Sequence, residues 1–291
     1  MARVRKAVLP VAGLGTRVLP ATKTIPKELL NVVDRPILSY VVAEARAAGI
    51  EHLVFVTGRG KQAIEDYFDH QVELEGQLRE KNKSAMLEAL LSELPRPGEM
   101  SFVRQMAPLG LGHAVWCARD IIGDEPFAVM LPDMIMDAEP GALAQAIAAH
   151  EQTGGANIIV VEPCPEGEAH KYGVVALEQR QGRLNRMTGM VEKPAPGTEP
   201  SNLFISGRYV LNASIFEALA AQEKGAGGEI QLTDAMARLM RSEPFHALEY
   251  QGVTYDCGDK VGLLRANVAL ALKRPDLGEA SRAAILDVMG R

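Results

Sequence analysis

The chain has few cysteines, no long hydrophobic run and no excess of positive charge. Its three cysteines, Cys117, Cys164 and Cys257, are far apart, and no C-x-x-C motif is present. Such spacing indicates neither a disulfide framework nor a zinc site, so we expect reduced thiols and a cytoplasmic location. No apolar stretch approaches about 18 residues, and the sequence therefore predicts neither a membrane-spanning helix nor a membrane partner.

The charge and the length narrow the class of protein further. The formal net charge is −6, which leaves no broad basic face and argues against a nucleic-acid partner. With 291 residues, of which 47% are hydrophobic, the chain forms one large domain or two closely joined ones. A local group of cations on this acidic background suits a small anionic ligand better than a polymer.

A glycine loop near the N-terminus is the most informative motif. The apolar run Ala7–Ala12 predicts a buried strand, and Gly13-Leu14-Gly15 follows it. Glycines let the main chain approach a ligand and expose N–H groups to phosphate oxygens. Cations follow at Arg17, Lys23, Lys27 and Arg35. Together they predict a site for a nucleoside triphosphate, although a plain strand-to-loop turn with surface cations is the alternative.

Two better-known phosphate loops do not fit this segment. No G-x-x-x-x-G-K-[ST] motif is present, and the third glycine of a G-x-G-x-x-G fingerprint is replaced by Val18. The missing glycine also argues against an α/β oxidoreductase. Because Pro20 and Pro26 follow, we expect no ordinary helix directly after the loop.

The hydrophobic pattern predicts an α/β fold with a mostly parallel, mixed sheet flanked by helices. The expected strands are Ala7–Ala12, His52–Thr57, Ser101–Gln105, Phe127–Leu131 and Asn157–Glu162. The expected helices between them are Ile37–Ala48, Lys61–Phe68, His113–Asp120 and Gly141–Gln152. Ligands of such sheets bind beyond the carboxyl ends of the strands.

Three other segments depart from this alternation. Residues 71–94 are charged and helical, which indicates an insertion on the surface. Strand-like runs at Tyr172–Leu177, Arg183–Val191 and Leu203–Leu211 predict a small antiparallel or mixed extension. The last part, Lys260–Asp287, is predicted to form two helices that Pro275 separates.

Two aspartates are candidate metal ligands. Asp133 ends an apolar strand, and Asp256 lies in the segment Thr254–Asp259. Mg²⁺ typically takes one or two protein carboxylates together with phosphates and water, so these residues suit a magnesium site beside the triphosphate loop. The alternative for either residue is a helix N-cap or a turn, because a helix-like stretch follows Asp133 and Asp137.

Two further motifs carry polar groups at strand ends. Gln105 offers one acceptor and two donors, which match the imide edge of uracil or thymine, and Gly110 would let a flat base lie against the main chain. We interpret His113 as a structural histidine. Glu192 and Lys193 end another strand, and on an extended chain they point to opposite sides, so we expect no salt bridge between them.

These motifs resemble the bacterial UTP–glucose-1-phosphate uridylyltransferases of the sugar-1-phosphate nucleotidyltransferase superfamily. The matches occur in the family's order over nearly the whole chain, with one departure at Asn31, where a proline is expected. They are AGLGTR at 12–17, IPKE at 25–28, TGRGK at 57–61, PLGLGHAV at 108–115, LPD at 131–133, YGVV at 172–175, EKP at 192–194, GRYVL at 207–211, GEIQLTDA at 228–235 and YDCGDK at 255–260.

The resemblance implies a Rossmann-like fold and a role for each matched residue. Nucleotide-binding positions would be Ala12, Gly13, Gly15, Gln105, Gly110 and Met134. Arg17 and Lys27 would bind the triphosphate, and Lys193 the phosphate of the sugar. Sugar hydroxyls would contact Gly173, Glu192 and Gly207. Asp133, and more weakly Asp256, would bind Mg²⁺.

The resemblance also implies an activity and an organisation. The expected reaction transfers the uridylyl group of UTP to α-D-glucose 1-phosphate, and gives UDP-glucose and pyrophosphate. The same chemistry with dTTP or another sugar phosphate, or a non-catalytic nucleotide-binding paralogue, are the alternatives. We expect a catalytic domain at residues 1–259 and, at 260–291, C-terminal helices that serve as the interface of a homodimer or homotetramer.

Overall fold

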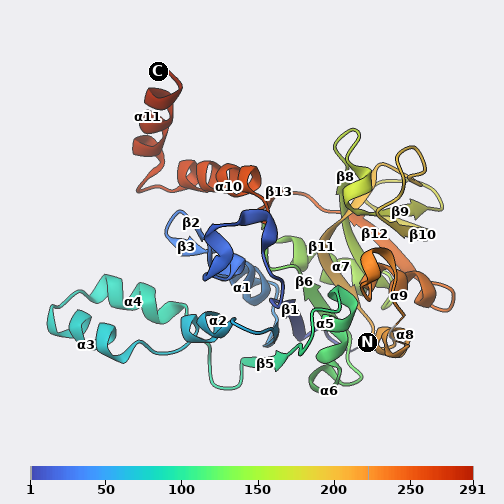
Figure 1. The fold of residues 1–291 in the computed structure, drawn as a ribbon, viewed down its shortest axis with the longest axis horizontal. Coiled ribbons are helices and arrows are strands. Elements are labelled where there is room, and N and C mark those ends of the chain that lie inside the picture. The colour runs from blue at the N-terminus through green and yellow to red at the C-terminus, as the bar shows by residue number, and fades with distance from the viewer. Residues whose placement is uncertain (1, 222, 291) are drawn as a thin grey trace.

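A nine-stranded sheet forms the centre of the computed structural model, which describes residues 2–221 and 223–290 (Figure 1). Its strands are β1 (Lys6–Pro10), β4 (His52–Thr57), β5 (Met100–Arg104), β6 (Phe127–Met130), β8 (Asn157–Pro163), β9 (Gly173–Leu177), β10 (Leu184–Glu192), β11 (Leu203–Leu211) and β12 (Phe245–Glu249). Their spatial order is β5-β4-β1-β6-β11-β8-β12-β10-β9. The predicted α/β class and mixed sheet are confirmed.

The sheet has a parallel half and a mixed half. β5, β4, β1 and β6 are parallel to one another, whereas β11 is antiparallel to both β6 and β8. The prediction that Leu203–Leu211 lies in a peripheral extension is therefore wrong. All nine residues of β11 are buried, and a strand covered on both faces and both edges belongs at the centre of a sheet.

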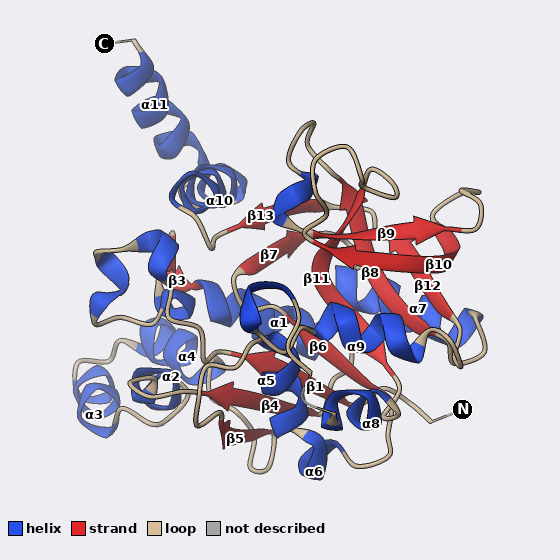
Figure 2. Cartoon of the chain, turned by 45° about the vertical axis from the view of Figure 1, so that its right-hand side comes forward, coloured by secondary structure: helices blue, strands red, loops and turns tan. Residues whose placement is uncertain are grey.

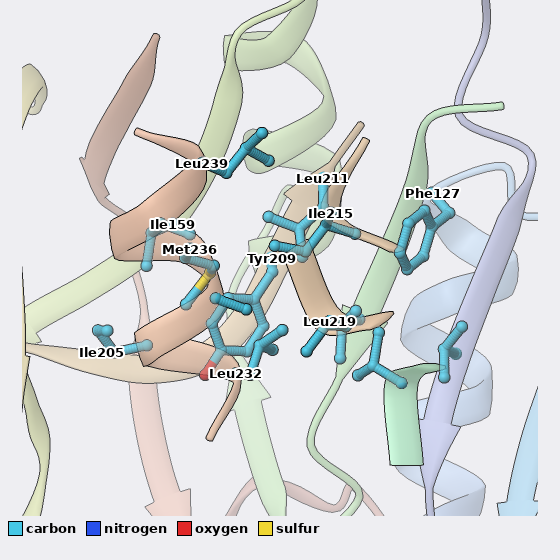
Figure 3. Close-up of a cluster of buried hydrophobic side chains, with 14 of the residues drawn as sticks. Phe127, Ile159, Ile205, Tyr209, Leu211, Ile215, Leu219, Leu232, Met236 and Leu239 are labelled. Atoms are coloured by element: carbon cyan, nitrogen blue, oxygen red, sulfur yellow. The ribbon is translucent and has the colours of Figure 1, made fainter. Parts of the chain in front are cut away.

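Helices cover both faces of the sheet, and the alternation of side chains along each strand explains how. On β1, Val8 packs on one face, whereas Ala7 and Leu9 pack on the other. The first face carries α5 (Leu111–Cys117), α6 (Arg119–Ile122), α8 (Ile215–Ala220) and α9 (Leu232–Leu239). Figure 3 shows buried side chains of α8 and α9 beside those of β11. The second carries α1 (Ile37–Ala47), α2 (Gln62–Tyr67) and α7 (Ala142–Gln152).

The segment after β1 has no α-helix, as the prolines predicted. Three short 3₁₀ turns take its place, η1 (Thr16–Val18), η2 (Ala21–Lys23) and η3 (Lys27–Leu29). The turns lead into a small ladder of β2 (Asn31–Val32) and β3 (Arg35–Pro36). Further 3₁₀ turns are η4 (Ala169–Lys171) and η5 (Ala226–Gly228).

The residues after Asp133 are a strand and not a helix-like stretch. β7 (Met134–Asp137) pairs antiparallel with β13 (Val253–Asp256), so that Asp256 lies directly opposite Met134. The partner strand β13 is distant in the sequence, so the local hydrophobic pattern around Asp133 could not indicate this pairing. It brings both predicted metal ligands to one place, because Asp133 and Asp256 occupy the same end of this two-stranded ladder.

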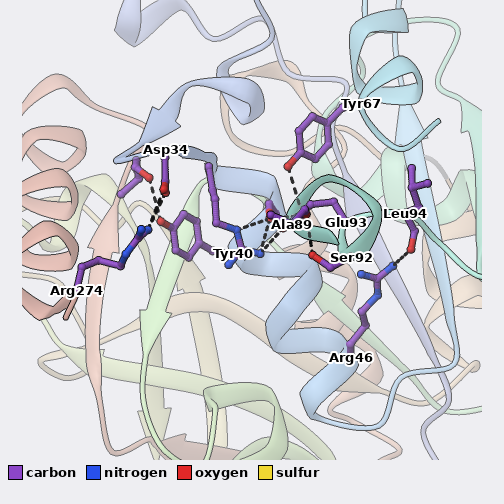
Figure 4. A network of polar contacts seen from close by, with 12 residues as sticks. Asp34, Tyr40, Arg46, Tyr67, Ala89, Ser92, Glu93, Leu94 and Arg274 are labelled. Carbon is purple, nitrogen blue, oxygen red and sulfur yellow. Dashed lines mark hydrogen bonds and ion pairs between the residues drawn. The ribbon is translucent and has the colours of Figure 1, made fainter. Parts of the chain in front are cut away.

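Two helical pairs extend from the body of the molecule (Figures 1 and 2). α3 (Val72–Glu80) and α4 (Ser84–Ser92) form the first, and α10 (Lys260–Lys273) and α11 (Gly278–Met289) the second, with Asp259 capping α10. Glu93 ties the end of α4 to α1, because it accepts hydrogen bonds from Arg35, Ser39 and Tyr67 (Figure 4). Within the described residues, no helix has the length and apolar character needed to cross a membrane.

Candidate active site

A cleft of about 430 Å³ lies where the parallel strands end. The loop after β1 forms one wall with Gly13 and Gly15, and residues that follow β5 and β6 form the others. Gln105 and Gly110 line the cleft together with Lys27 and Asp133. The cleft therefore combines the predicted base-binding residues with charged residues predicted for the phosphates and the metal.

Gln105 and Gly110 contact each other in the wall of the cleft. The Gln105 side chain is buried, and its Nε2 donates a hydrogen bond to the Gly110 carbonyl oxygen at 3.1 Å. Gly110 has φ 106°, and a Cβ there would lie 2.8 Å from Glu229 Cβ and from the Ile230 carbonyl oxygen. Only glycine fits this position, and the loop before α5 therefore packs tightly on the segment before α9.

A cluster of opposite charges also lines the cleft. Lys27 Nζ donates to Asp133 Oδ2 at 2.5 Å, and Arg17 lies 3.7 Å from the same oxygen. Burial opposes the ionisation of Asp133, but the Lys27 ammonium outweighs it and lowers the pKa of this carboxyl. Burial likewise opposes the charge on Lys27, yet Asp133 raises the pKa of the ammonium. Both groups are thus held in their charged forms.

Lys27 is positioned by a second ion pair behind it. Its neighbour Glu28 is fully buried and accepts a hydrogen bond from Lys61 Nζ at 2.7 Å. Because Glu28 and Lys61 pack under the turn η3, Lys27 on the same turn projects into the cleft. This arrangement explains why cations at 27 and 61 both occur in the quoted motifs while only Lys27 lines the cleft.

Asp256 joins the cluster through Arg17 and Gly258. Arg17 lies 3.8 Å from Asp256 Oδ2, and the pKa of Asp256 is raised by burial and by the charge of Asp133. A Cβ on Gly258 would lie 2.7 Å from Asp133 Oδ2 and 2.9 Å from Asp256 Oδ1. The two carboxylates therefore converge over a residue that has no side chain.

Met134 is the first residue of β7, next to Asp133. It lines a second cavity of about 390 Å³, which also contacts Tyr172 and Asp256, and not the cleft that contains Gln105. Ala12, another predicted nucleotide-binding position, lines the cleft that contains Gln105.

The predicted sugar-binding residues lie around β9, β10 and β11. Glu192 Oε2 accepts a hydrogen bond from Thr233 Oγ1 at 2.8 Å, and a Cβ on Gly173 would lie 3.0 Å from that oxygen. Gly207 has φ 83°, and a Cβ there would clash with Leu131, which lines the cleft. Glycines thus let β9 approach the Glu192 carboxylate and β11 approach Leu131 closely.

Lys193 does not continue the extended chain. Its φ is 50°, an uncommon conformation for a residue other than glycine, and its N–H donates to the Tyr172 carbonyl oxygen at 2.9 Å. The expectation that Glu192 and Lys193 form no salt bridge is wrong, because Nζ lies 3.8 Å from Glu192 Oε1. The turn at Lys193 brings the ammonium back to the side of the carboxylate.

Comparisons with known proteins agree with this geometry. The nucleotidyl transferase family model matches residues 6–272. A UTP–glucose-1-phosphate uridylyltransferase of Staphylococcus saprophyticus is 48% identical over 94% of both chains, and one of Bacillus subtilis is 47% identical over 95% of this chain and 94% of that protein. The chain belongs to the nucleotidyl transferase family. Within this family it groups with the UTP–glucose-1-phosphate uridylyltransferases, and it is an enzyme.

Solved structures of this nucleotidyl transferase family extend the comparison. A UDP-glucose pyrophosphorylase from Acinetobacter baumannii superposes with a TM-score of 0.90 at 44% identity, and covers 98% of this chain and 99% of its own. A UTP-bound structure of that enzyme has the same TM-score and identity over 97% of this chain and 99% of its own. A UDP-glucose pyrophosphorylase complexed with UDP-glucose has a TM-score of 0.85 at 38% identity, over 93% of this chain and 100% of its own.

Sequence reasoning missed several residues of this transferase site. Glu229 lines the cleft, Thr233 binds Glu192, and Gly258 separates the carboxylates. All three lie in motifs shared with the family, at 228–235 and 255–260, and this was the only indication of a role. Neither their residue types nor their spacing indicated which groups they contact. Arg208 was also missed. It is fully buried and donates to the carbonyl oxygens of Leu131 and Met134, on either side of Asp133.

Proposed function

We propose that this enzyme transfers the uridylyl group of UTP to α-D-glucose 1-phosphate and releases pyrophosphate. The observation that carries the proposal is the single cleft that is lined both by Gln105 and Gly110 and by the charged residues Lys27 and Asp133. A base and its phosphates need such a pair of sites in one cavity. The likeness to a UTP-bound and a UDP-glucose-bound relative supports both the nucleotide and the product.

The nucleotide would bind along the glycine loop. Ala12, Gly13 and Gly15 bring the main chain against the ligand, and Gln105 with Gly110 contacts the uracil edge. Met134 would lie near the ribose. Arg17 and Lys27 would neutralise the phosphate oxygens with charge-assisted hydrogen bonds, which stabilise the charge that moves onto pyrophosphate.

Asp133 and Asp256 would hold Mg²⁺. Their oxygens converge over Gly258, and hard carboxylate oxygens are the ligands this ion prefers. Among the residues that the structure describes, no group of three or more acidic, histidine or cysteine side chains gathers for a metal. An ion held by these two aspartates would take its other ligands from phosphates and water. When bound, it supplies charge neutralisation at the triphosphate.

The sugar phosphate would bind beside β9 and β10. Gly173, Glu192 and Gly207 would contact the sugar hydroxyls, and Lys193 the phosphate. A phosphate oxygen of the sugar then attacks the α-phosphorus of UTP in line, a new P–O bond forms, and the bond to pyrophosphate breaks. The attacking oxygen is already ionised, so no general base and no covalent enzyme intermediate are needed.

The C-terminal helices and the location of the enzyme belong to the same proposal. α10 and α11 expose Val261, Leu264, Leu286 and Met289, and we propose that they form the interface of a homodimer or homotetramer. We propose a cytoplasmic enzyme, because both substrates are intracellular metabolites. The catalytic domain would then comprise residues 1–259, with α3 and α4 as its surface insertion.

The first prediction is that UTP with glucose 1-phosphate is the best substrate pair. Pyrophosphate release measured over a matrix of nucleoside triphosphates and sugar 1-phosphates should give the highest kcat/KM for this pair. Uracil and thymine differ by one methyl group, which a pocket discriminates by only about 1–3 kcal/mol. A higher kcat/KM with dTTP would assign the enzyme to thymidylyl transfer, and binding of UTP without any turnover would indicate a regulatory paralogue.

The second prediction concerns Lys193, whose side chain is half exposed. Lys193→Ala should raise KM for glucose 1-phosphate roughly ten- to 150-fold, because a hydrogen bond to a charged group contributes about 1.5–3 kcal/mol. KM for UTP should change far less. Steady-state kinetics with each substrate varied in turn measures both. The matched control is Lys171→Ala, which removes an equally exposed lysine that pairs with Glu168. A defect confined to UTP would place Lys193 on the other substrate.

A further inference from the structure

His113 lies directly behind the residue that would contact the base. It is on α5, half-buried, and its Nδ1 lies 3.0 Å from Gln105 Nε2. The same Nε2 donates to the Gly110 carbonyl oxygen at 3.1 Å. Both hydrogens of the Gln105 amide nitrogen therefore have partners inside the protein.

These two contacts fix the orientation of the amide. A carbonyl oxygen can only accept, so the end of Gln105 that faces Gly110 must be the NH₂ group. If the amide were flipped, Gln105 Oε1 would face the Gly110 carbonyl oxygen, and the lone pairs of the two oxygens would repel each other. His113 Nδ1 must then accept the second hydrogen, which requires a neutral imidazole that carries its proton on Nε2. Burial lowers the pKa of His113 and favours this neutral form.

The remaining polar atom of the side chain is Gln105 Oε1. No donor among the described residues reaches it, and Gln105 lines the cleft. An oxygen in this position accepts a hydrogen bond from a base and cannot donate one. Uracil and thymine present N3–H as a donor, whereas cytosine bound in the same orientation presents a lone pair at N3, which repels the oxygen.

We propose that His113 is a positioning residue that locks the Gln105 amide, so that the enzyme accepts pyrimidines with an N3–H and rejects cytosine. This inference rests on the proposed function, because it assumes that Gln105 contacts the base. It assigns a role to a histidine that the sequence predicted to be only structural, and it makes no distinction between UTP and dTTP.

The test compares UTP with CTP in two variants of His113. His113→Leu removes the acceptor, and His113→Asn keeps one, because the asparagine Oδ1 takes a place close to that of Nδ1. We expect the ratio of kcat/KM for UTP over CTP to fall roughly two- to twelvefold in His113→Leu, as for the loss of one hydrogen bond. His113→Asn should keep most of the ratio. Calorimetric titration with each nucleotide alone should show the same change in the ratio of dissociation constants.

Cys117 provides the matched control. Its Sγ lies 3.8 Å from His113 Nδ1, the nitrogen that accepts from Gln105. Cys117→Ala should leave the UTP/CTP ratio unchanged, because the thiol does not touch Gln105. An equal loss in Cys117→Ala and His113→Leu, an equal loss in both His113 variants, or an unchanged ratio in His113→Leu would each overturn the proposal.

A measurement on the wild-type enzyme covers the case in which a variant does not fold. Nitrogen NMR of histidine-labelled protein distinguishes the two neutral tautomers, and the locked amide requires the Nε2–H form at His113. The Nδ1–H form would overturn the proposal. If the wild-type enzyme does not turn over UTP at all, the proposed function fails. If it turns over UTP but His113→Leu keeps the ratio, only the role of His113 fails.

Discussion

Asp133→Asn should lower kcat about 10²–10³-fold and leave the fold intact. The proposed role of Asp133 is to hold Mg²⁺ beside the triphosphate, and loss of one electrostatic contact to the reacting group has an effect of about this size. Asparagine is nearly isosteric, and its amide oxygen still accepts the hydrogen bond from Lys27 Nζ, which lies 2.5 Å from Asp133 Oδ2. Turnover at saturating substrates across a Mg²⁺ titration, with a circular dichroism spectrum of each protein, measures both expectations.

Two neighbouring aspartates serve as comparisons for Asp133. Asp256→Asn should have a smaller effect, since Arg17 at 3.8 Å pairs with this carboxylate less closely than Lys27 pairs with Asp133, and the pKa of Asp256 is already raised. Asp137→Asn is the matched control, because Asp137 lies at the other end of β7 and pairs with Lys273. It should leave turnover unchanged. Near-normal activity of Asp133→Asn at limiting Mg²⁺ would remove Asp133 from the metal site.

The parts of the site that lie at strand ends could be predicted from sequence. Gly13, Gln105 and Asp133 each follow a strand of the parallel half, and parallel strands bring their carboxyl ends to one edge of the sheet. The hydrophobic runs identified those strands, and their parallel arrangement brings the residues that follow them together.

The prolines after the glycine loop also predicted correctly that no α-helix would follow, because this effect is local to the backbone.

Features that depend on distant pairing could not be predicted. β11 enters the middle of the sheet between β6 and β8, although its sequence alone reads like any buried strand. Asp256 reaches Asp133 only because β13 pairs with β7. Lys193 turns back toward Glu192 through a positive φ that no residue-level rule assigns to lysine. In each case tertiary contacts override the local pattern.

Arg208 is the largest fully buried polar side chain, and its environment leads to the prediction with the largest effect on stability. Its guanidinium donates to Glu44 Oε2 at 2.7 Å, and also to the carbonyl oxygens of Leu131 at 3.0 Å and Met134 at 2.8 Å. Glu44 in turn accepts a hydrogen bond from the Leu143 N–H at 2.9 Å. This arrangement links α1 and α7 to the turn that carries Asp133.

Arg208→Met should therefore lower the free energy of unfolding by about 3–5 kcal/mol, because it leaves the largely buried Glu44 carboxylate without the guanidinium that neutralises its charge. Urea unfolding followed by both circular dichroism and the fluorescence of Trp116 measures the loss. The matched control is Arg186→Met on β10. Arg186 is 66% exposed and lies 3.9 Å from Glu178, so its removal should cost only about 0–1 kcal/mol. Equal stabilities of the two variants would contradict this prediction. They would show that the hydrogen bonds and ion pair of Arg208 only balance the cost of removing its charge from water. Because Arg208 holds the carbonyls on both sides of Asp133, the folded fraction of Arg208→Met should also turn over more slowly than wild type.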